Sequence, residues 1–130
     1  MLSNRTSVGL DVHARSVVAC GLDGQTGRLF ERRLTPDHGE ILGWVRSLPG
    51  PVAVTYEAGP TGCGLARFLT AEGVDCHVAA PSKLHRPSGD RVKTDARDAV
   101  HLARLLRLGE LPAVTVPSVD QEAARDLVRA

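Results

Sequence analysis

The stretch TSVGLDVHARSVVACGLDGQTGRLFERRL, residues 6–34, decides the fold. It holds two runs rich in Val and Leu, and a third run in which apolar and polar residues alternate as they do in a half-buried strand. Short turn sequences separate these runs, and one of them combines Asp with Gly, which favours a tight hairpin turn. Three consecutive strands joined by tight turns predict an antiparallel meander. The expected strands are residues 6–12, 15–22 and 28–34, joined at His13-Ala14 and at Asp23-Gly24 with Gly27.

After residue 34 the apolar residues take the spacing of helices that alternate with short buried strands. This order after a meander predicts a mixed α/β sheet with helices on its faces. The stretch PSKLHRPSGDRVK is rich in Pro and charge, so we expect a loop with room for one short helical turn, mobile without ligand. Thr94 then caps a helix that begins at Asp95. The expected elements are helix 37–48, strand 52–56, helix 63–72, strand 74–79, loop 81–93, helix 95–108, extended segment 111–116 and a last helix 119–130.

The composition indicates one cytoplasmic domain with an aliphatic core. The chain has 130 residues, 42% of them hydrophobic, but only two Phe, one Tyr and one Trp. No segment approaches the roughly 18–20 apolar residues of a membrane span, and we find no secretory signal. Cys20, Cys63 and Cys76 lack the spacing of metal ligands, so we expect reduced, buried thiols.

Two acids stand where strands are expected to present a site. Asp11 lies in the apolar run VGLDV, and a buried carboxylate must be paired, hydrogen-bonded or bound to metal. Glu57 directly follows an apolar strand, and sites in α/β sheets gather at the carboxyl ends of strands. The structural alternatives for Asp11 are an edge position that faces solvent and a turn residue that serves the following His13-Ala14. The alternative for Glu57 is a Gly-rich turn used only for chain reversal.

Asp95 and Asp98 form a pair at positions i and i+3, so they point the same way on the expected helix. Their like charges repel each other, and a divalent cation such as Mg²⁺ or Mn²⁺ removes that repulsion. The alternative is that both are ordinary acids in the first turn of a helix, where they are favourable. Combined with Asp11 and Glu57, the pair can hold two metal ions for phosphodiester chemistry.

Basic residues concentrate around this acidic pair, which suits a polyanion such as DNA. A solvated loop and the outer face of a helix are the alternative explanation. His85 and His101 also flank the acids. The expected nucleic-acid contacts are Lys83, Arg86, Arg91, Lys93 and Arg97.

The arrangement of acids resembles the ribonuclease-H-like fold of nucleases, resolvases and many transposases. The segments VGLDVHARSVVACGLD, VTYEAGPTG and above all VKTDARDAVHLARLLRLGELP are similar to the N-terminal, RuvC-like domain of DEDD-type transposases of bacterial insertion sequences, relatives of the Piv DNA invertases. The resemblance covers essentially the whole chain. It implies that Asp11, Glu57, Asp95 and Asp98 are the catalytic, metal-binding acids of that family.

The resemblance also implies a domain organisation and a set of partners. We expect a catalytic domain at residues 1–110 and, at residues 111–130, the start of a helical linker to a C-terminal transposase domain absent from this chain. The implied activity is DNA cleavage and strand transfer with Mg²⁺ or Mn²⁺. An element-encoded structured RNA and homo-oligomers of the full-length protein are implied partners. We expect the isolated domain not to transpose DNA alone.

The residues leave two other functions open. An actin-like or sugar-kinase-like ATP-binding domain shares the meander and an early Asp, although Asp11-Val12-His13 lacks a Gly-rich phosphate loop. A non-catalytic module that binds nucleic acid or protein would use the same acids as helix caps and the basic stretch as its contact surface.

Overall fold

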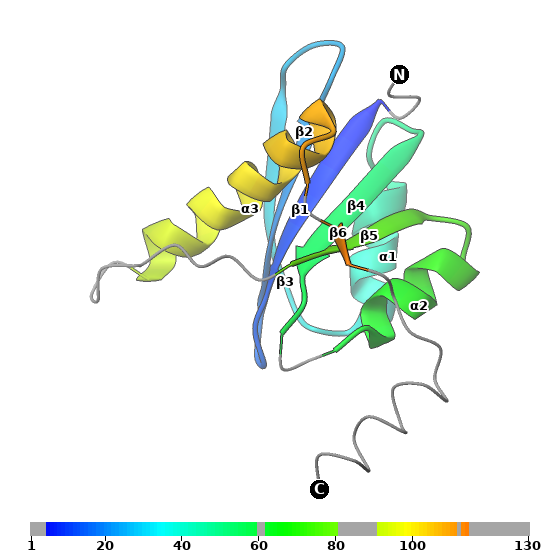
Figure 1. Ribbon diagram of the computed structural model, residues 1–130, viewed down its shortest axis with the longest axis vertical. Helices are drawn as coiled ribbons and strands as arrows, with labels where there is room; N and C mark the ends of the chain where they lie inside the picture. The colour runs from blue at the N-terminus through cyan, green and yellow to red at the C-terminus, as the bar shows by residue number, and fades with distance from the viewer. Residues whose placement is uncertain (1–4, 60–61, 81–90, 112, 115–130) are drawn as a thin grey trace, which may run out of the picture.

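The computed structural model describes residues 5–59, 62–80, 91–111 and 113–114, and only the backbone of residues 91–96 and 113–114. Within these ranges a mixed sheet carries helices on both of its faces (Figure 1). The elements in chain order are β1 (Thr6–Val12), β2 (Val17–Asp23), β3 (Leu29–Leu34), α1 (His38–Arg46), β4 (Val52–Glu57), α2 (Gly64–Ala71), β5 (Asp75–Ala79), α3 (Arg91–Leu108) and β6 (Ala113–Val114).

The sheet has the strand order β3-β2-β1-β4-β5-β6. The first three strands form the antiparallel meander that the sequence predicts. β4 pairs parallel with β1, β5 pairs parallel with β4, and the short β6 pairs antiparallel with β5. β1 therefore lies inside the sheet, with β2 on one side and β4 on the other. This is the ribonuclease-H-like α/β arrangement expected from the sequence, and that prediction is confirmed.

The helices α1 and α2 cover one face of the sheet and enclose an aliphatic core. Its one fully buried aromatic residue is Tyr56, whose hydroxyl donates to the carbonyl oxygen of Gly62 at 3.1 Å and accepts the N–H of Ala66 at 3.1 Å. These bonds satisfy the polar end of a side chain that is otherwise surrounded by apolar atoms. The core side chains include Val8, Leu10, Val17, Ile41, Val45, Val54, Leu69 and Val78.

The helix α3 crosses the other face, where it packs against β1, β2 and β4 (Figure 1). Gly9 of β1 permits this close approach. A Cβ atom at residue 9 would lie 2.1 Å from the carbonyl oxygen of Ala99 and 2.9 Å from the Cβ of Leu102. Any side chain at residue 9 would therefore push α3 away from the sheet.

The start of α3 corrects the prediction from sequence. The helix begins at Arg91, so Thr94 lies inside it and does not cap it, and no acid lies in the first turn. The predicted loop is wrong for residues 91–93, which are helical, while residues 81–90 and the predicted helix 119–130 lie outside the described residues. The predicted start is too late for a physical reason. Residues 91–93 (Arg, Val, Lys) are all compatible with a helix, and Asp, the residue type at position 90, caps helices as well as Thr does.

An ion pair fastens the end of the sheet where β1 begins. Arg5 donates from Nε to Oδ1 of Asp23 at 3.2 Å and from Nη2 to Oδ2 at 3.0 Å. The carboxylate also accepts the backbone N–H of Gln25 at 2.9 Å. These hydrogen bonds, the one from Arg5 first, hold the pKa of Asp23 well below its usual range.

The three cysteines are free thiols, as the sequence predicts. Cys20 and Cys63 are buried, and Cys76 is half-buried. Burial raises the pKa of Cys20 to about 11 and the pKa of Cys76 to about 12. No helix in the described ranges is long and apolar enough to cross a membrane.

Candidate functional site

The pairing register places two of the predicted acids at the same edge of the sheet. Leu10 of β1 is the pairing partner of Tyr56 of β4, so Asp11 and Glu57 are the next residues on two neighbouring parallel strands. Side chains alternate along a strand, and Leu10 and Tyr56 point into the core beneath α1 and α2. Asp11 and Glu57 therefore face the side of the sheet on which α3 lies.

Asp11 is held close to a histidine of the first hairpin. The Nε2 atom of His13 lies 3.0 Å from the Oδ2 atom of Asp11, and each of these two atoms exposes less than 1 Å². The Asp11 side chain is 14% exposed, so the edge position open to solvent is excluded. The turn holds His13 in place through its backbone N–H, which donates to the carbonyl oxygen of Ser16 at 2.9 Å.

The sequence offers Asp11 as a turn residue that serves His13-Ala14, and the structure shows that contact, but sequence reasoning did not assign His13 to the candidate site. The signal that could have found it is the spacing Asp11-Val12-His13, because residues i and i+2 at a strand end lie on the same face. Glu57 is half-buried, and its carboxylate makes no hydrogen bond or ion pair with any residue that the structure describes. It is therefore an available oxygen ligand beside Asp11.

The helix α3 brings a third acid to this face. Asp98 immediately precedes Ala99, whose carbonyl oxygen lies against Gly9 of β1. The Asp98 side chain is half-buried, and its Oδ2 atom exposes less than 1 Å². The close packing of α3 on Gly9 thus sets the position of Asp98 beside β1, the strand that carries Asp11.

The structure places the side chains of three of the four predicted acids, but not that of the fourth. Asp11 and Glu57 lie at the carboxyl ends of β1 and β4, on the face that α3 covers, and Asp98 lies on α3 one residue before the contact of Ala99 with Gly9. Asp95 lies three residues before Asp98 on the backbone of α3, and its side chain is outside the described residues. In the part of the chain that the structure describes, no three Asp, Glu, His or Cys side chains are grouped closely enough to hold a metal ion as they stand.

The donor set nevertheless has the chemistry of a site for a hard divalent cation. All the candidate ligands are carboxylates, and Mg²⁺ and Mn²⁺ prefer oxygen donors. Asp11 and Asp98 each have one carboxylate oxygen that is shielded from solvent, and that of Asp11 lies 3.0 Å from Nε2 of His13. The residues present therefore fit a metal ion of this class.

Of the predicted nucleic-acid contacts, only Arg97 has a described side chain. It is exposed on α3, one residue before Asp98. Arg91 and Lys93 contribute backbone to the first turn of α3, and their side chains lie outside the described residues. Lys83 and Arg86 lie entirely outside them.

The mixed sheet begins with an antiparallel meander. One acid lies at the end of its first strand, a second on the adjacent parallel strand and a third on a later helix. This combination defines the chain as a ribonuclease-H-like domain of the nuclease and transposase class. The sequence profile of the DEDD-type transposases of IS110-class insertion sequences, described as "Transposase", matches residues 8–130. The chain belongs to this transposase family. Membership in it decides against the actin-like ATP-binding alternative.

Two relatives give the scale of the similarity. "Putative transposase y4qE" of Sinorhizobium fredii (strain NBRC 101917 / NGR234) is 64% identical over 75 residues, which are 58% of this chain and 19% of the relative. "Transposase for insertion sequence element IS1533" of Leptospira borgpetersenii is 32% identical over 133 residues, which cover 98% of this chain and 38% of the relative. The chain thus spans well under half the length of these curated relatives.

Proposed function

We propose that this chain supplies the metal-dependent step of insertion-sequence transposition, in which DNA phosphodiester bonds are cleaved and strands are transferred. The observation that supports the proposal is the β1–β4 register, which makes Asp11 and Glu57 neighbours on the face of the sheet where α3, the helix that carries Asp98, packs on Gly9. Family membership supports the same activity.

In this proposal Asp11, Glu57, Asp95 and Asp98 hold one or two Mg²⁺ or Mn²⁺ ions. When bound, such ions supply an activated nucleophile and stabilise the leaving oxygen of the phosphodiester. The chain itself contributes the geometry. β1 and β4 carry Asp11 and Glu57 on adjacent strands. α3, which packs on the same face of the sheet, carries Asp95 and Asp98.

His13 has a positioning role in the same proposal. Its contact with Asp11 fixes the rotamer of that side chain and keeps one oxygen away from bulk water. A ligand whose orientation is fixed in advance loses less conformational freedom when it binds a cation.

DNA is the proposed substrate, and the basic residues near the acids are its proposed contacts. These residues are Lys83, Arg86, Arg91, Lys93 and Arg97. In the full-length protein, a structured RNA of the element and a second protomer are further proposed partners. We also propose that residues 111–130 begin a linker to a C-terminal transposase domain.

The test of the site is calorimetric titration of the chain with Mn²⁺. The variants Asp11→Asn and Asp98→Asn keep the shape of each side chain but remove its charge, and we expect each to weaken Mn²⁺ binding at least about 10-fold, as loss of a metal-site group commonly does. Asp75→Asn is the matched control, because Asp75 is an exposed acid that lies 2.8 Å from His77 on β5. Equal affinity in the wild type and all three variants would refute the proposed site.

A further inference from the structure

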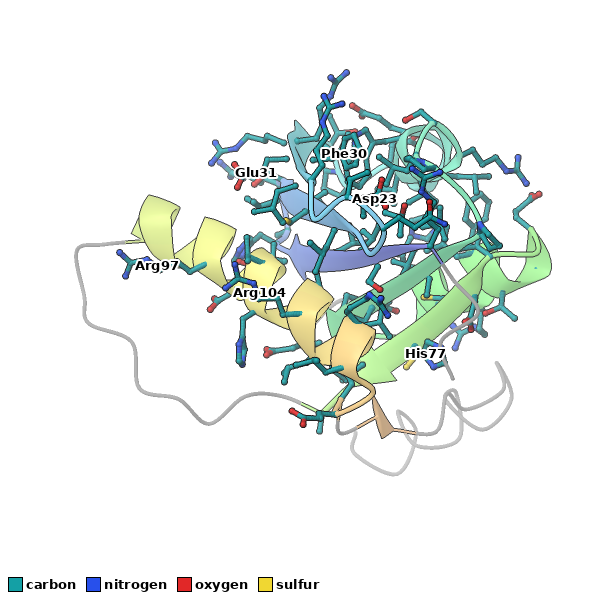
Figure 2. All side chains as sticks on the ribbon, turned by 90° about the horizontal axis from the view of Figure 1, so that it is seen from above. Asp23, Phe30, Glu31, His77, Arg97 and Arg104 are labelled. Atoms are coloured by element: carbon teal, nitrogen blue, oxygen red, sulfur yellow. The ribbon has the colours of Figure 1, made fainter. Side chains whose placement is uncertain are left out.

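A second surface lies on the side of α3 that faces away from β4. A groove of about 270 Å³ runs between this helix and the edge strand β3, and its lining residues are Glu31, Arg97, Val100, His101 and Arg104. Figure 2 shows Arg97 and Arg104 along α3, with Glu31 on the neighbouring strand. We call this surface the α3–β3 groove.

The cations of the α3–β3 groove form one stripe. Arg97, His101 and Arg104 are separated by four and three residues, so they lie on the same side of the helix, and all three are exposed. Arg97 and Arg104 make no hydrogen bond or ion pair with any residue in the described ranges, although Glu31 lines the same groove. The groove thus offers two guanidinium groups whose donors no described residue uses.

The sheet connects this groove to the acids. Val18 of β2 pairs with Asp11 on one side and with Arg33 of β3 on the other, so the three residues form a row across the sheet on the α3 face. Adjacent strands lie about 4.8 Å apart, which places Arg33 about 10 Å from Asp11 along this row. At the other boundary of the groove, Arg97 directly precedes Asp98 on α3. The cationic stripe therefore begins beside the carboxylates and leads away from them.

We infer that the α3–β3 groove binds the sugar-phosphate backbone of a nucleic-acid strand and guides it toward the acids. This inference rests on the proposed function for the identity of the polyanion. Arg104 follows Arg97 by seven residues, which corresponds to about 10 Å along the helix. That length matches about three phosphates on one strand, at about 3.4 Å per phosphate along a duplex axis.

The lining also predicts how the strand is recognised. Among the described lining residues the only aromatic ring is the imidazole of His101, and no Phe, Tyr or Trp offers the bases a larger surface for stacking. Guanidinium groups bind phosphates of any sequence. The groove therefore selects for phosphodiester backbone and not for base identity or for the 2′-hydroxyl of RNA.

The experiment measures binding of the 130-residue chain to fluorescein-labelled oligonucleotides by anisotropy, in EDTA, so that no metal contributes. The variant Arg97→Ala/Arg104→Ala removes two phosphate contacts. At about 0.7 salt-slope units per contact on a single strand, we expect the slope of log K against log salt to fall by about 1.4 and the affinity at 0.1 M salt to fall about 20-fold. Glu31→Gln removes the opposing charge and should tighten binding.

Arg32→Ala is the matched control. Arg32 is exposed on β3 next to Glu31, but it pairs with Ala19 and so lies on the opposite, α1–α2 face. This variant loses the same charge and should bind within about twofold of the wild type, because it removes no phosphate contact. Circular dichroism of each variant checks that the fold is unchanged.

Single-stranded DNA, single-stranded RNA and duplex DNA form separate arms of the measurement, and oligo-dT and mixed-sequence strands are compared in the DNA arm. The groove predicts equal losses for DNA and RNA strands in the double variant. The proposed role of the groove would be overturned if the double variant bound nucleic acid as tightly as the wild type, or if Arg32→Ala lost as much affinity as the double variant. It would also be overturned if the wild-type chain bound no nucleic acid. Groove-dependent binding by a chain that binds no Mn²⁺ would instead keep the groove and refute the proposed metal site.

Discussion

Gly9 holds α3 against the sheet, and Gly9→Ala tests how strictly the fold depends on that contact. A Cβ at this position would lie 2.1 Å from the carbonyl oxygen of Ala99 and 2.8 Å from the backbone nitrogen of Ala103. Because carbon–oxygen contacts are ordinarily about 3.3 Å or longer, α3 would have to move away by about 1.2 Å. The obstructing atoms are backbone, so no side-chain rotation can relieve the clash.

The expected magnitude follows from two opposing terms. Overpacking of this kind costs about 3 kcal/mol, at the upper end of the usual range because backbone must move. Replacing Gly by Ala within a strand recovers about 0.5–1 kcal/mol of backbone conformational entropy. The net loss in the free energy of unfolding is about 2 kcal/mol, which lowers the melting midpoint by about 5–10 °C in a chain of this size. Movement of α3 also carries Asp98 away from Asp11, so Mn²⁺ binding should weaken in the same variant.

The assay is urea unfolding followed by circular dichroism, with Gly43→Ala as the matched control. Gly43 is exposed on α1, and a Cβ there would meet nothing within 4 Å. The same substitution should therefore stabilise the helix, by about 1 kcal/mol. If Gly9→Ala unfolds at the wild-type urea concentration or above it, the close approach of α3 to β1 is not a feature of the folded protein.

Two further predictions follow from shifted pKa values. Because the folded-state pKa of Asp23 lies below its ordinary value of 3.8, its stabilising effect is complete above that pH and is lost as the pH falls toward the folded-state pKa. Urea midpoints measured from about pH 6 to about pH 2 should therefore fall less steeply for Asp23→Asn than for the wild type, and equal slopes would contradict the ion pair with Arg5. Since burial raises the pKa of Cys20 to about 11 and of Cys76 to about 12, both thiols should react with an aromatic disulfide reagent at about pH 8 at least about 100-fold more slowly in the folded chain than in urea. Mass spectrometry identifies the labelled cysteine, and equally fast labelling of both thiols in the folded chain would show that they are not protected.

The order of elements could be predicted because each one carries its own local pattern. Alternation over residues 28–34 and helical spacing over residues 37–48 mark their elements without reference to the rest of the fold. Asp37 shows how local chemistry sets a boundary, since its Oδ2 atom accepts the N–H of Glu40 at 3.0 Å where α1 begins. The start of α3 was predicted wrongly because several residues of capping type precede it and the sequence does not rank them.

The candidate site was predictable only in part. The positions of Asp11 in an apolar strand and of Glu57 directly after one could be recognised, because each strand carries its own apolar pattern. The packing of α3 on Gly9 could not be predicted, since it depends on where a helix crosses a sheet about 90 residues away in the chain. The spacing Asp11-Val12-His13 indicates that the two residues share a face, but the 3.0 Å contact between their side chains also depends on the conformation of the turn after β1.

The central claim is that the carboxylates gathered by β1, β4 and α3 bind a divalent cation. A crystal structure of the chain soaked in Mn²⁺, with anomalous data collected near the manganese edge, tests it most directly. The account predicts an anomalous peak coordinated by oxygens of Asp11, Glu57 and Asp98, with Asp95 completing the set. A well-ordered crystal with no peak at these carboxylates, or with manganese bound only elsewhere, would contradict it.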